Sequence, residues 1–99
     1  MVIWTRHALA QLRHIHDYIA ADSPLYAKRV SETFVTKCQG LDALPHLGRM
    51  LPELNDTNVR ELSLYSYRII YEIQANQIVV LAIVHKRKDL QPDEVGASP

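Results

Sequence analysis

The stretch YRIIYEIQANQIVVLAIV, residues 67–84, decides the fold of this 99-residue chain. Its first part alternates between apolar and polar side chains from Tyr67 to Ile73, which is typical of a strand with one covered face and one partly open face. Its last seven residues are all apolar, as expected of a strand that is buried on both faces. We therefore predict strands over residues 67–74 and 77–87, joined by the polar turn Ala75-Asn76.

Further strands are predicted upstream of this hairpin. Residues 59–64 form the preceding strand, separated from the hairpin only by Tyr65-Ser66. Residues 45–52 contain two prolines and a glycine and predict a loop. At the amino-terminal end, residues 2–4 are β-branched or aromatic and predict a short opening strand.

Two amphipathic helices are predicted between the opening strand and the loop. The first follows Thr5 as its N-cap and runs to about residue 21. The second begins at Pro24, with Ser23 as its cap, and ends near Leu44 because Pro45 disfavours a helical residue before it. The apolar positions recur with helical spacing, at Ala8, Leu12, Ile15 and Ile19 in the first helix and at Ala27, Val30, Phe34, Cys38 and Leu41 in the second. The short turn between the helices predicts an antiparallel helical hairpin.

The order β-α-α-β-β-β predicts an α+β fold, in which the helical hairpin packs on one face of a curved, mostly antiparallel sheet. The other face is expected to stay open to a partner or substrate. Residues 1–88 are expected to form a single domain, because so short a chain holds only one core. Residues 89–99 contain three acidic residues, two prolines and a glycine but no lysine or arginine, so we expect an irregular acidic tail.

The composition limits the possible function classes. The formal net charge is zero, and the residues before Asp89 carry 11 basic and 8 acidic side chains, a weaker basic bias than nucleic-acid-binding domains usually show. Cys38 is the single cysteine and no metal-ligand spacing occurs, so we predict no disulfide, metal site or cofactor. The amino terminus lacks a signal-peptide pattern, and no segment is apolar enough to span a membrane, which predicts a cytoplasmic protein without a membrane partner.

Several motifs, taken in their order along the chain, resemble those of one protein family. They are Trp4-Thr5 before a helix, Tyr18-Ile19-Ala20 leading to Asp22-Ser23-Pro24, Pro45 to Arg49 with the pair Gly48-Arg49, Arg60-Glu61-Leu62, Tyr67-Arg68-Ile69-Ile70-Tyr71, and Val84-His85-Lys86-Arg87. Their joint order and spacing, up to about Asp89, resemble the ParE/RelE toxin superfamily. Within it, the chain is most similar to the ParE-like plasmid-stabilisation toxins.

The resemblance implies the toxin of a type II toxin–antitoxin system, which a cognate ParD-like antitoxin keeps silent. It also implies one of two targets. RelE-like members cut messenger RNA in the ribosome, whereas ParE-like members poison DNA gyrase and have lost the catalytic set. We expect a non-enzymatic gyrase inhibitor. A ribosome-dependent mRNA endoribonuclease is the alternative, and a non-toxic member that only binds an antitoxin is a third interpretation.

The endoribonuclease alternative has its own candidate residues. Metal-free RNA cleavage requires a base, an acid and cations near the phosphate. The resemblance matches Arg68 and Arg87 to two arginines of RelE-like enzymes, and His85 lies near a histidine that other ribonuclease branches use. However, Arg60-Glu61-Leu62 stands where RelE-like enzymes carry lysines, and the last eleven residues contain no tyrosine. If the chain is a ribonuclease, Arg68, Arg87 and His85 are its catalytic residues; otherwise none is expected.

Basic side chains are also the candidates for contact with a target, namely Arg49, Arg60, Arg68, His85 and Arg87. Each has a structural interpretation as well. Arg68 is expected to pair with Glu72 or Glu61, and Gly48 to make a turn at positive φ. His85 is expected to be partly buried and hydrogen-bonded, and to point to the same side of its strand as Arg87.

Apolar residues beside the helical stripes are candidates for antitoxin binding. In this family the carboxy-terminal arm of the antitoxin docks across the helical hairpin and along the sheet. Exposed apolar side chains on the helix flanks are therefore predicted to form a groove for this arm, namely those of Leu9, Tyr18, Tyr26 and Val35. Scattered surface apolar residues, which any monomer carries, are the other interpretation.

Overall fold

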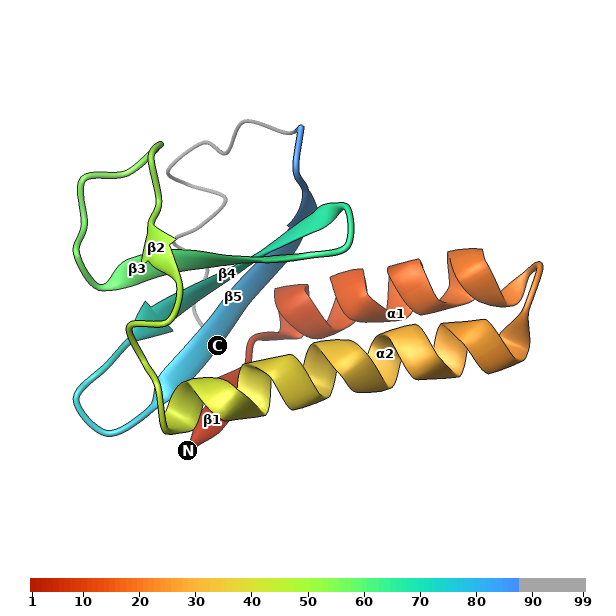
Figure 1. Cartoon of the computed structure of the whole chain (residues 1–99), viewed down its shortest axis with the longest axis horizontal. Coiled ribbons are helices and arrows are strands. Elements are labelled where there is room, and N and C mark those ends of the chain that lie inside the picture. The colour runs from red at the N-terminus through yellow and green to blue at the C-terminus, as the bar shows by residue number, and fades with distance from the viewer. Residues whose placement is uncertain (88–99) are drawn as a thin grey trace.

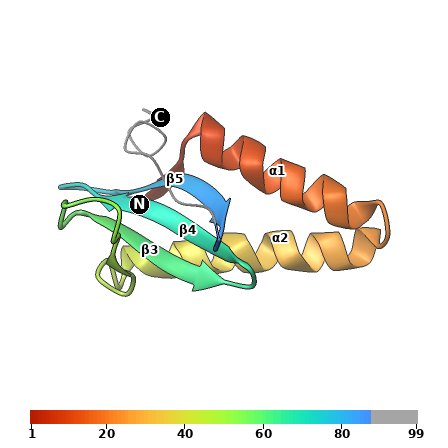
Figure 2. The same cartoon turned by 90° about the horizontal axis from the view of Figure 1, so that it is seen from above.

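The computed structural model describes residues 1–87, so Lys88 and the predicted acidic tail lie outside the described residues. The described elements are β1 (Val2–Trp4), α1 (Arg6–Ala20), α2 (Pro24–Gln39), the short 3-10 helix η1 (Gly40–Asp42), β2 (Arg49–Met50), β3 (Val59–Leu64), β4 (Tyr67–Ile73) and β5 (Ile78–His85). Figure 1 shows α1 and α2 side by side as an antiparallel hairpin, and Figure 2 shows that they lie on one side of the sheet. The predicted α+β fold is confirmed.

The strands form one mixed sheet in the order β1-β5-β4-β3-β2. β1 runs parallel to β5, whereas β5, β4, β3 and β2 pair antiparallel in that order. The ladder between β4 and β5 contains a bulge at Ile70/Tyr71. The two-residue strand β2 lies inside the segment that was predicted to be a loop, because its pairing with β3 comes from the tertiary fold and not from local sequence.

The helix caps are those that the sequence predicts. The Thr5 hydroxyl accepts a hydrogen bond from the Ala8 N–H at 3.0 Å and donates to the Leu81 carbonyl at 3.1 Å, so one buried side chain fixes α1 to β5. The Ser23 hydroxyl accepts from the Tyr26 N–H at 3.2 Å at the start of α2. The predicted end of α2 near Leu44 is wrong, since the helix ends at Gln39 and tightens into η1.

Each face of the sheet carries its own apolar core. Phe34 and the other stripe residues of the helices pack on Ile69, Val80 and Ile83. On the opposite face, Leu51 and Leu54 from the segment after β2 cover a second cluster that contains Ile70, Val79 and Val84. The prediction that this face stays open is therefore wrong, because the segment between β2 and β3 folds back over it.

Candidate functional site

Arg68 lies at the centre of a buried ion-pair network on the sheet face opposite the helices. Its Nη1 donates to Glu61 Oε2 at 2.8 Å and to Glu53 Oε1 at 3.1 Å, and its Nη2 donates to Glu53 Oε2 at 2.6 Å. The side chains of Arg68 and Glu61 are only 9% and 2% exposed. Hydrogen bonding to Glu53 raises the pKa of Arg68, while burial opposes this effect and the hydrogen bond to Glu61 reinforces it. The predicted pairing with Glu72 or Glu61 is confirmed by the contact with Glu61, and Glu53 is a partner that the sequence did not indicate.

Arg49 extends this network to the surface. Its Nε donates to Glu61 Oε1 at 2.7 Å, while its own side chain is 75% exposed. The contact follows from the pairing of β2 with β3, in which Arg49 stands opposite Glu61. Arg49 can therefore reach a partner at the surface while it is anchored on the buried carboxylate.

Tyr71 and Arg60 hold the segment that precedes β2. The Gly48 N–H donates to Tyr71 Oη at 2.8 Å, and the Tyr71 hydroxyl donates to the Pro45 carbonyl at 2.7 Å. Arg60 Nη1 donates to the Gly48 carbonyl at 3.0 Å. Burial raises the pKa of Tyr71. Arg60 therefore has a structural role at this site.

Position 48 requires a glycine because the chain packs closely there, and not because the backbone adopts a conformation that only glycine favours. No glycine among the described residues has positive φ, so the predicted positive-φ turn at Gly48 is wrong. A Cβ atom at this position would lie 2.5 Å from the Glu61 carbonyl oxygen and 2.7 Å from Tyr71 Oη. The Gly48-Arg49 pair thus allows the backbone to approach the sheet closely, immediately before Arg49 joins the ion-pair network.

His85 lies on the opposite side of the sheet from Arg68. It stands opposite Tyr67 in the β4–β5 ladder, and the two rings meet edge to face with centroids 5.8 Å apart. Successive side chains of a strand point to opposite faces, so Arg68 points away from this pair. The side chains of Arg68 and His85, two of the three ribonuclease candidates, are therefore separated by the sheet itself.

Two predictions for the end of β5 are wrong. His85 is exposed rather than partly buried. β5 ends at His85, so Arg87 lies in the following turn and not on the same side of a continued strand. The Arg87 N–H donates to His85 Nδ1 at 3.3 Å, so the two residues remain neighbours.

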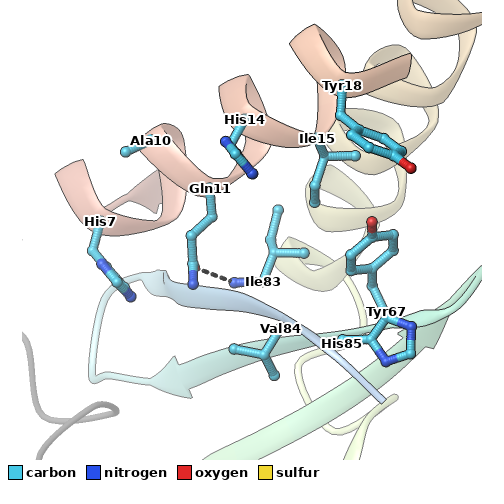
Figure 3. Close-up of a pocket in the computed structure, with 10 residues that line it drawn as sticks. All are labelled: His7, Ala10, Gln11, His14, Ile15, Tyr18, Tyr67, Ile83, Val84 and His85. Carbon is cyan, nitrogen blue, oxygen red and sulfur yellow. Dashed lines mark hydrogen bonds between the residues drawn. The ribbon is translucent and has the colours of Figure 1, made fainter. Parts of the chain in front are cut away.

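A groove runs between α1 and the second half of β5 (Figure 3). Tyr18 and Tyr67 face each other at one end of it, and His14 lies between the helix and the strand. The Gln11 side-chain oxygen accepts a hydrogen bond from the Ile83 N–H at 2.7 Å. His7 and His85 also line the groove. The groove is open because β1 pairs with β5 only at residues 78–80, which leaves the edge of β5 beyond them to face α1.

The four predicted antitoxin contacts are all exposed, but the structure does not bring them into one groove. Tyr18 lines the groove between α1 and β5. Tyr26 lies in a separate hollow between α2 and the β3–β4 turn. Leu9 and Val35, which are 52% and 37% exposed, line neither of them.

Other sequence expectations concern Cys38, metals and membranes. Cys38 is buried in the helix-facing core, and burial raises the pKa of its thiol to about 12. Within residues 1–87, no group of three or more His, Cys, Asp or Glu side chains is placed to hold a metal ion. Neither helix of this part of the chain is long and apolar enough to cross a membrane.

Comparison with known proteins identifies the family. Residues 2–90 match the family described as the ParE toxin of the type II toxin–antitoxin system parDE. The curated protein Toxin RelE2 of Caulobacter vibrioides is 35% identical over 85 residues, which make up 85% of this chain and 92% of the relative. A solved structure described as the chromosomal ParDE TA system from P. aeruginosa contains a chain that is 25% identical, with a TM-score of 0.70 over 85% of this chain and 92% of that one.

The fold and these relatives define a small toxin of the ParE/RelE superfamily, the toxin component of a type II toxin–antitoxin system. Within that superfamily, the chain belongs to the ParE toxin family.

Proposed function

We propose that this toxin acts in the cytoplasm by binding DNA gyrase, without catalysis of its own, and that a ParD-like antitoxin silences it. The position of Arg68 supports this proposal most strongly. A catalytic cation must direct its N–H donors at the phosphate. Arg68 directs both of its Nη atoms at carboxylates, and His85 lies on the other side of the sheet. These two residues cannot act on one phosphate in this arrangement.

Among the predicted target contacts, the side chains of Arg49, His85 and Arg87 are exposed and can reach a gyrase surface. Arg60 and Arg68 are more deeply placed and make internal hydrogen bonds. We therefore propose that Arg49, His85 and Arg87 contact the target. Arg60 and Arg68 support the fold from within.

Parallel assays on purified toxin test the target. We expect cleaved DNA to accumulate with gyrase, while messenger RNA on translating ribosomes stays intact. His85→Ala with Arg87→Ala is expected to weaken the effect on gyrase about tenfold, which corresponds to a loss of about 1.4 kcal/mol of contact energy. Arg13→Ala on the exposed side of α1 removes the same kind of charge and should change nothing. Messenger RNA cut by the toxin, with gyrase unaffected, would instead establish the endoribonuclease alternative.

For the antitoxin, we propose the groove between α1 and β5 as the docking site. The Ile83 N–H points away from β4, since it bonds to Gln11. In an antiparallel ladder the N–H and the carbonyl of one residue point to the same side, so the Ile83 carbonyl also faces the groove. An extended arm that takes the place of the Gln11 side chain at the Ile83 N–H can pair with this edge, while its apolar side chains pack between Tyr18 and Tyr67.

Charged substitutions on the helices test this docking site. Tyr18→Glu is expected to raise the Kd for the antitoxin about 30-fold, an effect of about 2 kcal/mol, because it places a charge at the apolar end of the groove. Leu9→Glu should have a smaller effect, since Leu9 lies outside the groove. Leu25→Glu is the matched control, as Leu25 is 63% exposed and lines no part of the groove. Equal affinities for the wild type and Tyr18→Glu in a titration would exclude the groove.

A further inference from the structure

The tip of the β3–β4 hairpin lies between two hollows. Tyr65 lines both of them. One hollow is bounded by α2 and contains Tyr26, Arg29 and Lys37, whereas the other contains His85, Lys86 and Arg87. The Lys86 N–H donates to the Ser66 carbonyl at 2.9 Å, which holds the turn after β5 against the hairpin tip. We refer to Tyr65, Ser66 and the residues that line these two hollows as the hairpin-tip surface.

Positive charge is concentrated on this surface. Residues 1–87 carry ten Lys and Arg against eight Asp and Glu. Arg29, Lys37, Lys86 and Arg87 line the two hollows, and Glu32 is the acidic residue beside them. The rest of the described chain therefore carries six Lys and Arg against seven Asp and Glu. The weak basic bias of the sequence as a whole thus conceals a local surplus of three cations.

Tyr65 is held in a conformation that a tyrosine rarely adopts. Its φ of 54° makes it the one non-glycine residue with positive φ among the described residues. The first position of such a two-residue hairpin turn favours glycine. The ring nevertheless packs edge to face against Phe34, with centroids 6.0 Å apart, and stays 47% exposed. A strained residue that presents a supported aromatic ring to solvent is typical of a binding site.

We propose that the hairpin-tip surface binds single-stranded DNA, with one base stacked on Tyr65 and the flanking phosphates against the cations on either side. Exposed aromatic rings between basic side chains are the usual means by which proteins hold unpaired nucleotides. The choice of DNA rests on the proposed function, because gyrase acts on DNA. The contact itself needs only the toxin, so it can be tested without gyrase.

Fluorescence anisotropy with a labelled strand of about 15 thymidines tests the proposal, since single-strand binding sites are about this long or shorter. We expect saturable binding that weakens between about 50 and 200 mM salt, with a slope near −0.7 for each phosphate contact. Tyr65→Gly removes the ring but suits the turn, and it should weaken binding at least about tenfold. Tyr65→Phe keeps a stacking surface and should bind like the wild type.

Charge substitutions provide the second arm of the test. Lys86→Gln with Arg87→Gln should weaken binding and reduce the salt slope by about 1.4, the value for two lost phosphate contacts. Arg6→Gln with Arg13→Gln removes two exposed cations from α1 and should leave both quantities unchanged. Thermal unfolding of each variant verifies that the fold is intact.

Several outcomes would overturn the proposal. These are no saturable binding at low salt, equal losses in the two double variants, equal affinity for a duplex of the same length, or tighter binding of the matching RNA strand. The two proposals fail separately. If the toxin poisons gyrase but does not bind single-stranded DNA, only the DNA-binding proposal fails. If it binds single-stranded DNA but has no effect on gyrase, only the proposed target fails.

Discussion

Arg68→Ala is expected to lower the free energy of unfolding by about 3–5 kcal/mol. The substitution removes the guanidinium that contacts both Glu61, which is 2% exposed, and the partly buried Glu53, so that Glu61 keeps only its contact with the exposed Arg49. Removing one partner of a buried ion pair costs about this much, because the remaining charge stays desolvated. Chemical denaturation monitored by circular dichroism measures the loss.

A double-mutant cycle separates this effect from a loss of packing. Glu53→Gln should itself be destabilising in the wild type but much less so in the Arg68→Met background, where the charge partner is already absent. Arg68→Ala with wild-type stability would contradict the role assigned to the network. Because Arg68→Ala is expected to be much less stable, it should lose toxicity through unfolding alone. Such a loss would identify Arg68 as a catalytic residue only if the fold of the variant is intact.

Gly48→Ala is expected to destabilise the fold by about 1–3 kcal/mol, while Gly40→Ala should stabilise it by about 0.4–1 kcal/mol. At Gly48 the added methyl group meets a carbonyl oxygen and the Tyr71 hydroxyl, both of which are fixed by the sheet. At Gly40 no atom lies within 4 Å of the added group, and φ is −63°, so alanine mainly reduces the entropy of the unfolded chain.

The two alanine variants make the same chemical change at two different positions, so their melting temperatures can be compared directly. Opposite shifts are expected. A Gly48→Ala protein as stable as the wild type would show that the segment before β2 can move away from Tyr71, and the close approach would then not be required.

The local patterns of the sequence predict most of the fold. The apolar run of β5 and the alternation of β4 place the sheet, and Thr5 and Ser23 mark where the helices begin. These features are local, since each depends on residues within a few positions of one another. The end of α2 was predicted too late because η1 continues the helical pattern beyond Gln39 with tighter hydrogen bonding.

The candidate site was harder to predict because it depends on contacts between distant residues. Glu53 binds Arg68 across 15 positions from a segment without regular structure, and no periodic pattern indicates this. The separation of Arg68 from His85 could have been derived, because Tyr67 and His85 are opposite each other once the hairpin register is known. The positive φ of Tyr65 could not be predicted, because a turn residue with positive φ gives no signal in the sequence unless it is glycine or asparagine.

The sheet order also has a consequence for how the toxin is made. β5 lies between β1 and β4, yet it is the last strand of residues 1–87 to leave the ribosome. A nascent chain that stops before Ile78 has no strand against which β1 can pair, and long-range pairing of this kind forms late in folding. We therefore expect incompletely translated toxin to remain unfolded and open to proteases, so that harm to the cell begins only after translation has passed β5.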